Sequence, residues 1–264
     1  MKKKIRKILL KKNKSKIVCL TAYSKNTAKI LDNYCDIILV GDSMANVLYG
    51  LENTHQISLD NILQHSLSVK KGVKKSLLVV DMPKNTYKNI KDAEKNAKLI
   101  FKKTGCDAVK LESNNKNFDI IKNLIKKNIP VMGHIGYTPQ FKKKFKVEGN
   151  TPHKANKLLK EALSIQKAGA FSIVLECLSS GASKLITKNL KIPTIGIGSS
   201  SYCDGQILVT DDMLGISGFY PKFVKKYANL NSLIEKAVKK YTREVKLNKF
   251  PATNNFLNDR KHRS

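Results

Sequence analysis

The sequence contains no tryptophan, only 5 cysteines and only four arginines. No two cysteines form a Cys-x-x-Cys pair, which argues against a zinc site or a disulfide framework and predicts reduced thiols. A membrane-spanning helix needs about 20 consecutive apolar residues, and no such run occurs. The basic first residues surround an apolar cluster that is too short for a signal peptide. These absences predict a cytoplasmic protein with no membrane partner.

Acidic residues are scarce as well, at 20 against 50 Lys and Arg, which gives a net charge of +30. Such a charge is compatible with nucleic-acid binding. However, the basic residues are nearly all Lys and are spread along the whole chain, whereas base and phosphate recognition favours Arg. We therefore favour solvated lysine faces and no specific nucleic-acid partner. A basic nucleic-acid-binding protein is the alternative from another functional class.

The length of 264 residues, with 41% apolar residues, is compatible with one large α/β domain or two small ones. Several short segments are nearly all apolar, as in strands that are buried on both faces of a parallel sheet. The predicted strands are residues 17–23, 36–42, 76–81, 108–112, 130–135, 172–177, 194–198 and 206–210.

Amphipathic segments separate most of these strands and predict helices over residues 58–72, 88–103, 117–127, 151–168 and 180–189. Eight strands with helical spacers in about 250 residues predict a (β/α)8 barrel. A doubly wound sheet is the alternative, because periodicity does not reveal whether a sheet closes. We expect a single barrel domain over residues 1–264, with 1–16 as a basic lead-in and 248–264 as a polar, flexible tail.

Four of the few acidic residues stand at the ends of four different predicted strands: Asp42, Asp81, Glu112 and Glu176. In a parallel barrel these strand ends meet at one mouth. Carboxylates held that close raise one another's pKa unless a cation lies between them. Because an all-oxygen ligand set suits Mg²⁺, we favour a metal-assisted enzyme over a set of structural helix caps.

Lys110 and Glu112 lie two residues apart in a predicted strand, so their side chains face the same side. At the barrel mouth, Lys110 would hold a substrate carboxylate and offset the acidic residues. The alternative is an inward ion pair that only neutralises itself.

Longer segments carry a resemblance to a known family. They read TAYS at 21–24, VGDS at 40–43, DMP at 81–83, AVKLE at 108–112, PVMGHIGYTPQ at 130–140, AGAFSIVLEC at 168–177, IPTIGIGSS at 192–200, CDGQILV at 203–209 and FVKKYANL at 223–230. In this order, over about residues 15 to 230, the chain resembles the ketopantoate hydroxymethyltransferase (3-methyl-2-oxobutanoate hydroxymethyltransferase) family.

The resemblance implies a (β/α)8 TIM barrel of the phosphoenolpyruvate/pyruvate type that binds Mg²⁺ through Asp42, Asp81 and Glu112. It also implies that Glu176 is the catalytic general base and that substrate contacts Asp42, Ser43, Asp81 and Lys110. The substrates would be 3-methyl-2-oxobutanoate and 5,10-methylenetetrahydrofolate. The products would be 2-dehydropantoate and tetrahydrofolate, in pantothenate and coenzyme A biosynthesis. The assembly implied is a homodecamer.

His134, at the end of the fifth predicted strand, would bond a substrate oxygen or, equally, a neighbouring strand end. The chain departs from the family's usual residues at Met44-Ala45-Asn46, Lys84, Ser113-Asn114, Ser199-Ser200 and Tyr137. We expect these changes to affect donor binding and oxoacid preference more than the chemistry. Another Mg-dependent 2-oxoacid lyase or mutase of the same barrel superfamily is the alternative function.

Overall fold

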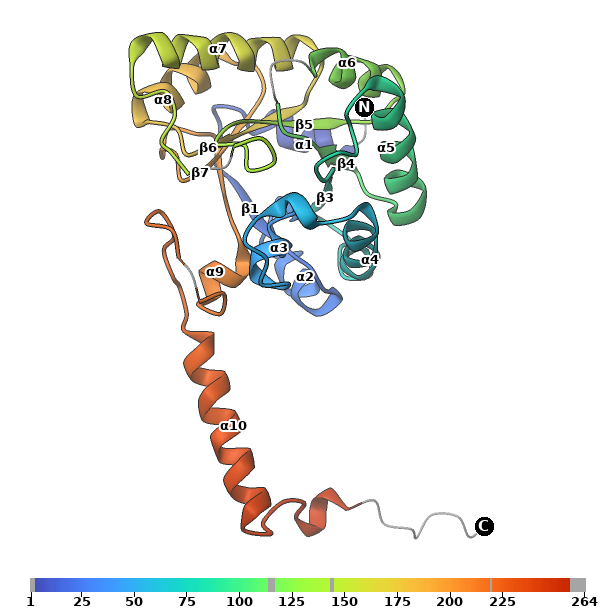
Figure 1. Cartoon of the computed structure of the whole chain (residues 1–264), viewed down its shortest axis with the longest axis vertical. Coiled ribbons are helices and arrows are strands. Elements are labelled where there is room, and N and C mark those ends of the chain that lie inside the picture. The colour runs from blue at the N-terminus through green and yellow to red at the C-terminus, as the bar shows by residue number, and fades with distance from the viewer. Residues whose placement is uncertain (1–2, 114–116, 143–144, 219, 257–264) are drawn as a thin grey trace.

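The computed structural model describes residues 3–113, 117–142, 145–218 and 220–256, and its strands form one closed parallel barrel (Figure 1). Each strand pairs with the next in chain order, and the last pairs with the first. This closure confirms the predicted barrel and excludes the doubly wound sheet. The strands are β1 (Ile17–Thr21), β2 (Ile37–Val40), β3 (Leu77–Asp81), β4 (Ala108–Lys110), β5 (Val131–Gly136), β6 (Ser172–Glu176), β7 (Thr194–Ile197) and β8 (Gly205–Leu208).

Several strands end earlier than predicted at the barrel mouth. β1 ends at Thr21 rather than Tyr23, and β4 ends at Lys110 rather than Glu112. Thr210, predicted to end the last strand, instead begins a short helix. There its backbone N–H donates to the side-chain hydroxyl of Thr21 on β1 at 3.1 Å rather than to a backbone carbonyl of that strand. Side-chain hydrogen bonds of this kind end the ladder where the chain turns away from the barrel.

Helices cover the outside of most of the barrel: α2 (Lys25–Leu31), α4 (Leu59–Lys70), α5 (Ile90–Thr104), α6 (Phe118–Lys126), α7 (Pro152–Lys167) and α8 (Ser180–Asn189). The predicted caps are present, since the Ser58 and Thr151 side chains accept from the third backbone N–H of their helices. Short elements follow strand ends: α3 (Met44–Val47), η1 (Thr54–Gln56) and α9 (Thr210–Leu214). Within the described ranges, no helix has the length and apolar character needed to cross a membrane.

The core has two apolar layers. The outer layer lies between the strands and the surrounding helices and includes Ile38, Val80 and Ile100. The inner layer fills the barrel and includes Ile37 and Val79. Alternate residues of each strand serve the two layers, which explains why the strands read as continuous apolar runs. The polar strand ends beyond these layers are therefore left at the mouth.

The basic lead-in is a helix, α1 (Lys3–Leu10), that closes the opposite end of the barrel. Its Ile5 and Ile8 are buried against residues that begin strands, such as Ile17. Lys4 on the same helix donates from Nζ to the Ser76 carbonyl oxygen at 2.7 Å. The helix thus seals the N-terminal end, and access to the barrel interior is from the C-terminal end.

The remaining helix, α10 (Leu230–Lys246), extends away from the barrel, followed by the short turn η2 (Thr253–Asn255) (Figure 1). None of its residues is buried. The predicted flexible tail began at residue 248, and residues 257–264 of it lie outside the described part of the chain.

We predict that α1 is required for stability because it fills the end of the inner core. Ile5→Ala should lower the free energy of unfolding by about 2–5 kcal/mol, since Ile5 is fully enclosed. Leu10→Ala on the same helix removes a side chain that is 57% exposed and should change it by less than about 0.5 kcal/mol. Chemical denaturation followed by circular dichroism measures both. Equal effects of the two substitutions would contradict the role of α1 as a plug.

Candidate active site

A cavity of about 1230 Å³ lies at the C-terminal ends of the strands. Every residue that the sequence singled out borders it: Asp42, Ser43, Asp81, Lys110, Glu112, His134 and Glu176. They come from five strands or the turns that follow them, β2 to β6. Barrel closure therefore brings together side chains that are far apart in the sequence.

Asp81 and Lys110 form a buried ion pair on the floor of the cavity. The two residues are register partners at the ends of β3 and β4, and Lys110 Nζ lies 2.9 and 2.8 Å from the two Asp81 carboxylate oxygens. Burial lowers the pKa of Lys110, but the carboxylates of Asp81, Asp42 and Glu112 outweigh it and hold that pKa above its usual value. Lys110 therefore stays charged and pairs with Asp81, not with Glu112.

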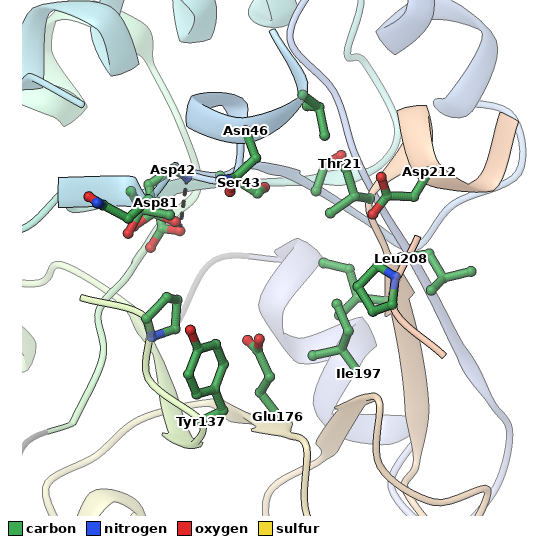
Figure 2. A pocket seen from close by; sticks show the side chains of 18 of the residues that line it. Thr21, Asp42, Ser43, Asn46, Asp81, Tyr137, Glu176, Ile197, Leu208 and Asp212 are labelled. Atoms are coloured by element: carbon green, nitrogen blue, oxygen red, sulfur yellow. Dashed lines mark hydrogen bonds between the residues drawn. The ribbon is translucent and has the colours of Figure 1, made fainter. Parts of the chain in front are cut away.

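Asp42 sits beside this pair, directly after β2. Its backbone N–H donates to Asp81 Oδ2 at 3.4 Å (Figure 2). Burial raises the pKa of Asp81, Lys110 opposes the shift, and the nearby Asp42 carboxylate raises it further. The two acids are thus close enough to repel, as the sequence argument expected.

Asp42, Asp81 and Glu112 border one side of the cavity, which we call the acidic wall. Gln140 connects two of these acids, although the sequence analysis assigned it no role. Its side-chain Nε2 donates to Asp42 Oδ2 at 2.8 Å, and its backbone N–H donates to Glu112 Oε2 at 3.0 Å. Its Oε1 accepts from the Tyr87 hydroxyl. The only sequence clue was its place at the end of the segment PVMGHIGYTPQ, since a glutamine in a loop has no periodicity to mark it.

The acidic wall offers oxygen ligands suited to a cation. Glu112 Oε1 is buried and has no hydrogen-bond partner among the described residues. Burial and the carboxylates of Asp42 and Asp81 raise the pKa of Glu112, with Lys110 opposing them. A cation would relieve both the repulsion and the orphaned oxygen.

These carboxylates are not yet gathered around one point. Within the part of the chain that the structure describes, no group of three or more acids, His or Cys is arranged to hold a metal ion. Lys110 and Gln140 occupy oxygens that a metal would need. The three predicted ligands border the same cavity and offer the oxygen donors that suit Mg²⁺.

Glu176 ends β6 on another side of the cavity, and Figure 2 shows its carboxylate pointing inward. Burial raises its pKa to about 7, and Lys110 opposes that shift. Cys177 follows with a left-handed φ of 54°, which turns the chain sharply after the acid. Gly136 on β5 also has positive φ, and a Cβ there would lie 2.2 Å from the Glu176 carbonyl oxygen. The close packing of these two strand ends fixes the direction of Glu176.

His134 lies between the acidic wall and Glu176. Its Nε2 is 3.1 Å from Glu176 Oε2, and its Nδ1 is 3.6 Å from Glu112 Oε1. Neither nitrogen has a partner in hydrogen-bonding geometry among the described residues. Burial, assisted by Lys110, holds the pKa of His134 well below its usual value. The ring is therefore neutral and has one N–H to donate toward Glu176 or a bound oxygen.

Comparison with known proteins decides the family. The sequence profile described as Ketopantoate hydroxymethyltransferase matches residues 2–253. The chain belongs to the ketopantoate hydroxymethyltransferase family. It is therefore an enzyme of a transferase family, as the quoted motifs predicted.

Relatives named 3-methyl-2-oxobutanoate hydroxymethyltransferase match almost the whole chain. The protein of Pelagibacter ubique (strain HTCC1062) is 52% identical over 251 residues, 95% of this chain and 98% of that protein. The protein of Anaplasma marginale (strain St. Maries) is 46% identical over 258 residues, 97% and 93% of the two chains.

Solved structures of low identity share the fold. A 2,3-dimethylmalate lyase, titled a PEP mutase/isocitrate lyase superfamily member, matches with a TM-score of 0.65 and 13% identity over 91% of this chain and 86% of that one. A phosphoenolpyruvate phosphomutase from Streptomyces platensis subsp. rosaceus matches with a TM-score of 0.61 and 13% identity over 92% and 86% of the two chains. These matches support the predicted (β/α)8 barrel fold. For the alternative function, a lyase or mutase, these matches support only the shared fold and not the activity.

Several positions that the sequence analysis named as departures from the family lie in or near this cavity. Asn46 borders the cavity, and Lys84 Nζ lies 3.1 Å from Nδ1 of His55, another cavity residue. Ser199 Oγ donates to the Leu175 carbonyl oxygen at 2.6 Å, beside Glu176. The prediction for Asn114 falls outside the described residues.

We predict that Gln140 stabilises the acidic wall. Gln140→Leu removes the donor to the Asp42 oxygen and the acceptor of the Tyr87 hydroxyl proton, so the free energy of unfolding should fall by about 1–3 kcal/mol. Gln64→Leu, on the exposed side of α4, should change it by less than about 0.5 kcal/mol. Denaturant titration without divalent cations compares the two. A Gln140 variant as stable as wild type would show that these bonds contribute nothing.

Proposed function

We propose that the chain transfers a hydroxymethyl group from 5,10-methylenetetrahydrofolate to 3-methyl-2-oxobutanoate, with Mg²⁺ bound at the acidic wall. The products are 2-dehydropantoate and tetrahydrofolate, in cytoplasmic pantothenate and coenzyme A biosynthesis. The observation that carries the proposal is the division of one cavity into an acidic wall, which includes Asp42 and Glu112, and a separate, inward-pointing Glu176. The names of the relatives at 46–52% identity support the choice of substrates.

The acidic wall would hold the metal and the oxoacid. Asp42, Asp81 and Glu112 are the residues that would bind Mg²⁺, and the ion would supply positive charge for the keto oxygen of the substrate. Lys110 is charged and buried at the same wall, so it would attract the substrate carboxylate. The Ser43 hydroxyl, 2.9 Å from the Tyr23 hydroxyl, has the capacity for a further bond to substrate.

Glu176 would remove the proton from C3 of the oxoacid. A carboxylate with its pKa raised to about 7 is a stronger base than an exposed one and is still half ionised near neutral pH. The C3 carbon then forms a bond to the donor methylene carbon. Over the whole reaction, both bonds from that carbon to the folate nitrogens N5 and N10 break, and the oxygen of one water replaces them as the hydroxyl group. The proton from C3 and one proton of the water end on the two nitrogens of tetrahydrofolate.

We predict Mg²⁺-dependent exchange of the C3 proton of 3-methyl-2-oxobutanoate with deuterium, without any folate, because proton removal precedes transfer. Nuclear magnetic resonance follows the loss of the C3–H signal. Glu176→Gln should slow exchange by about 10²–10⁴-fold while Mg²⁺ binding, measured by calorimetry, is retained. Glu94→Gln, on the outer helix α5, is the matched control and should exchange at the wild-type rate. A wild-type protein that neither exchanges nor forms 2-dehydropantoate sinks the proposal.

The same assay should depend on pH through Glu176. The acid works as a base only when ionised, so the exchange rate should rise with pH and level off once Glu176 is ionised. Burial raises its pKa to about 7, and the Mg²⁺ in the assay moves the rise in rate to a lower pH, because a nearby positive charge favours the carboxylate. A rate that is constant from pH 5 to 9 would remove Glu176 from the role of base.

We also propose that the chain self-associates through α10, in keeping with the expected homodecamer. The helix presents Ile234, Val238, Tyr241 and Val245 along one exposed side. The long helix that follows β8 in the described part of the chain, α10, extends away from the barrel (Figure 1), and Val18 on β1 is 47% exposed. A second copy of α10 on the face around Val18 would cover both apolar surfaces, which supports self-association.

We expect light scattering to give a mass several times the 29.6 kDa of one chain. Val238→Gln combined with Tyr241→Gln should reduce that mass, because both changes place amides in the apolar side of α10. Lys236→Gln combined with Lys240→Gln alters the other side of the helix and should leave the mass unchanged. A wild-type monomer would reject the proposed association.

A further inference from the structure

The cavity is larger than the oxoacid needs. Pockets of about 300–1,000 Å³ hold drug-sized ligands, and this one has about 1230 Å³. The acidic wall takes up one side of it. The other side is formed by residues of β7, β8 and the segments that follow, including Ile197, Leu208 and Asp212. Most of the residues on this second side are apolar. Among its few polar residues is one acid, Asp212.

Asp212 has no part in the mechanism above. It lies in α9, its residue is 9% exposed, and Figure 2 shows its carboxylate pointing into the cavity near Thr21, across from Asp42 and Asp81. Its side chain accepts a hydrogen bond from Ser217. None of the ion pairs between described residues includes it.

A carboxylate in this position selects against one ligand and for another. It disfavours an anionic group, such as the carboxylate of the oxoacid, directly beside it. A buried carboxylate with only a hydroxyl donor still has accepting capacity for N–H groups. Ile197 and Leu208 beside it offer an apolar surface suited to a flat ring.

Building on the proposed function, we infer that this side of the cavity binds the reduced pterin ring of the one-carbon donor and that the Asp212 carboxylate accepts from its ring N–H and 2-amino groups. These two donors stand side by side on the ring edge and match the two oxygens of a carboxylate. The ring face would pack on Ile197 and Leu208. The donor methylene would then face the oxoacid across the cavity, between Asp212 and the acidic wall.

Asp212→Asn tests this inference, because an amide keeps the shape but presents an N–H to the ring. Proton exchange at C3 needs no donor and should keep the wild-type rate. The KM for 5,10-methylenetetrahydrofolate should rise about tenfold to a hundredfold, the usual worth of hydrogen bonds to a charged group. Asp211→Asn, the neighbouring acid that does not border the cavity, is the matched control and should leave both values unchanged.

A second measurement separates recognition from folding. Calorimetry compares tetrahydrofolate with an analogue in which hydrogen replaces the 2-amino group. Wild type should bind the analogue more weakly, whereas the Asp212 variant should discriminate little between the two, because the interaction is already lost.

Three results would overturn the inference: an unchanged donor KM, equal loss of exchange and transfer, or undiminished discrimination in the variant. If wild-type protein shows neither exchange nor transfer, the proposed function fails instead, before the variant is considered.

Discussion

The buried ion pair between Asp81 and Lys110 is the constraint on which the mouth of this barrel depends. Register places the two residues opposite each other at the ends of β3 and β4. Asp42 and Glu112 lie within electrostatic reach of both. Without the lysine, three carboxylates would share a space from which water is largely excluded, which is strongly unfavourable. A single positive charge, held by strand pairing and not by a flexible loop, makes an acidic wall compatible with a folded barrel.

The same lysine distinguishes the acids from one another. It contacts Asp81 directly, whereas Glu176 lies on β6 and is paired with no lysine among the described residues. Burial then dominates for Glu176, and its pKa rises toward neutrality. Carboxylic acids in one cavity therefore differ in function because their surroundings differ. The acids near Lys110 and Gln140 suit binding of a cation, whereas the isolated Glu176 suits proton transfer. His134 lies between the two groups and is neutral, so it places no second positive charge beside Glu176.

The sequence was sufficient to predict the features that depend on a hydrophobic pattern or on a residue type that recurs at strand ends. Continuous apolar runs predicted the strands, and an acid at the end of several runs predicted a shared mouth. It was insufficient where a contact depends on the folded path of a loop. Gln140 is one polar residue in an irregular segment, and its bonds to Asp42 and Glu112 exist only after closure. Asp212 was hidden because Thr210 begins a helix instead of ending a strand. The structural role of the basic lead-in was missed as well. Ile5 and Ile8 lie on one face of a helix, but the many lysines around them obscure that apolar face in the sequence.

The net charge of +30 acts on an approaching ligand over a long range, whereas the acidic cavity acts on it at short range. Surface lysines act over roughly the Debye length, about 8 Å at physiological salt, and favour encounter with anions such as an oxoacid or a folate. Inside the cavity that field is replaced by short contacts, where Lys110 is the buried cation and carboxylates outnumber it. An anionic substrate drawn in by the surface would therefore meet net negative charge unless a metal cation is bound first. The distribution of charge thus favours an order in which the acidic wall is neutralised before the oxoacid enters.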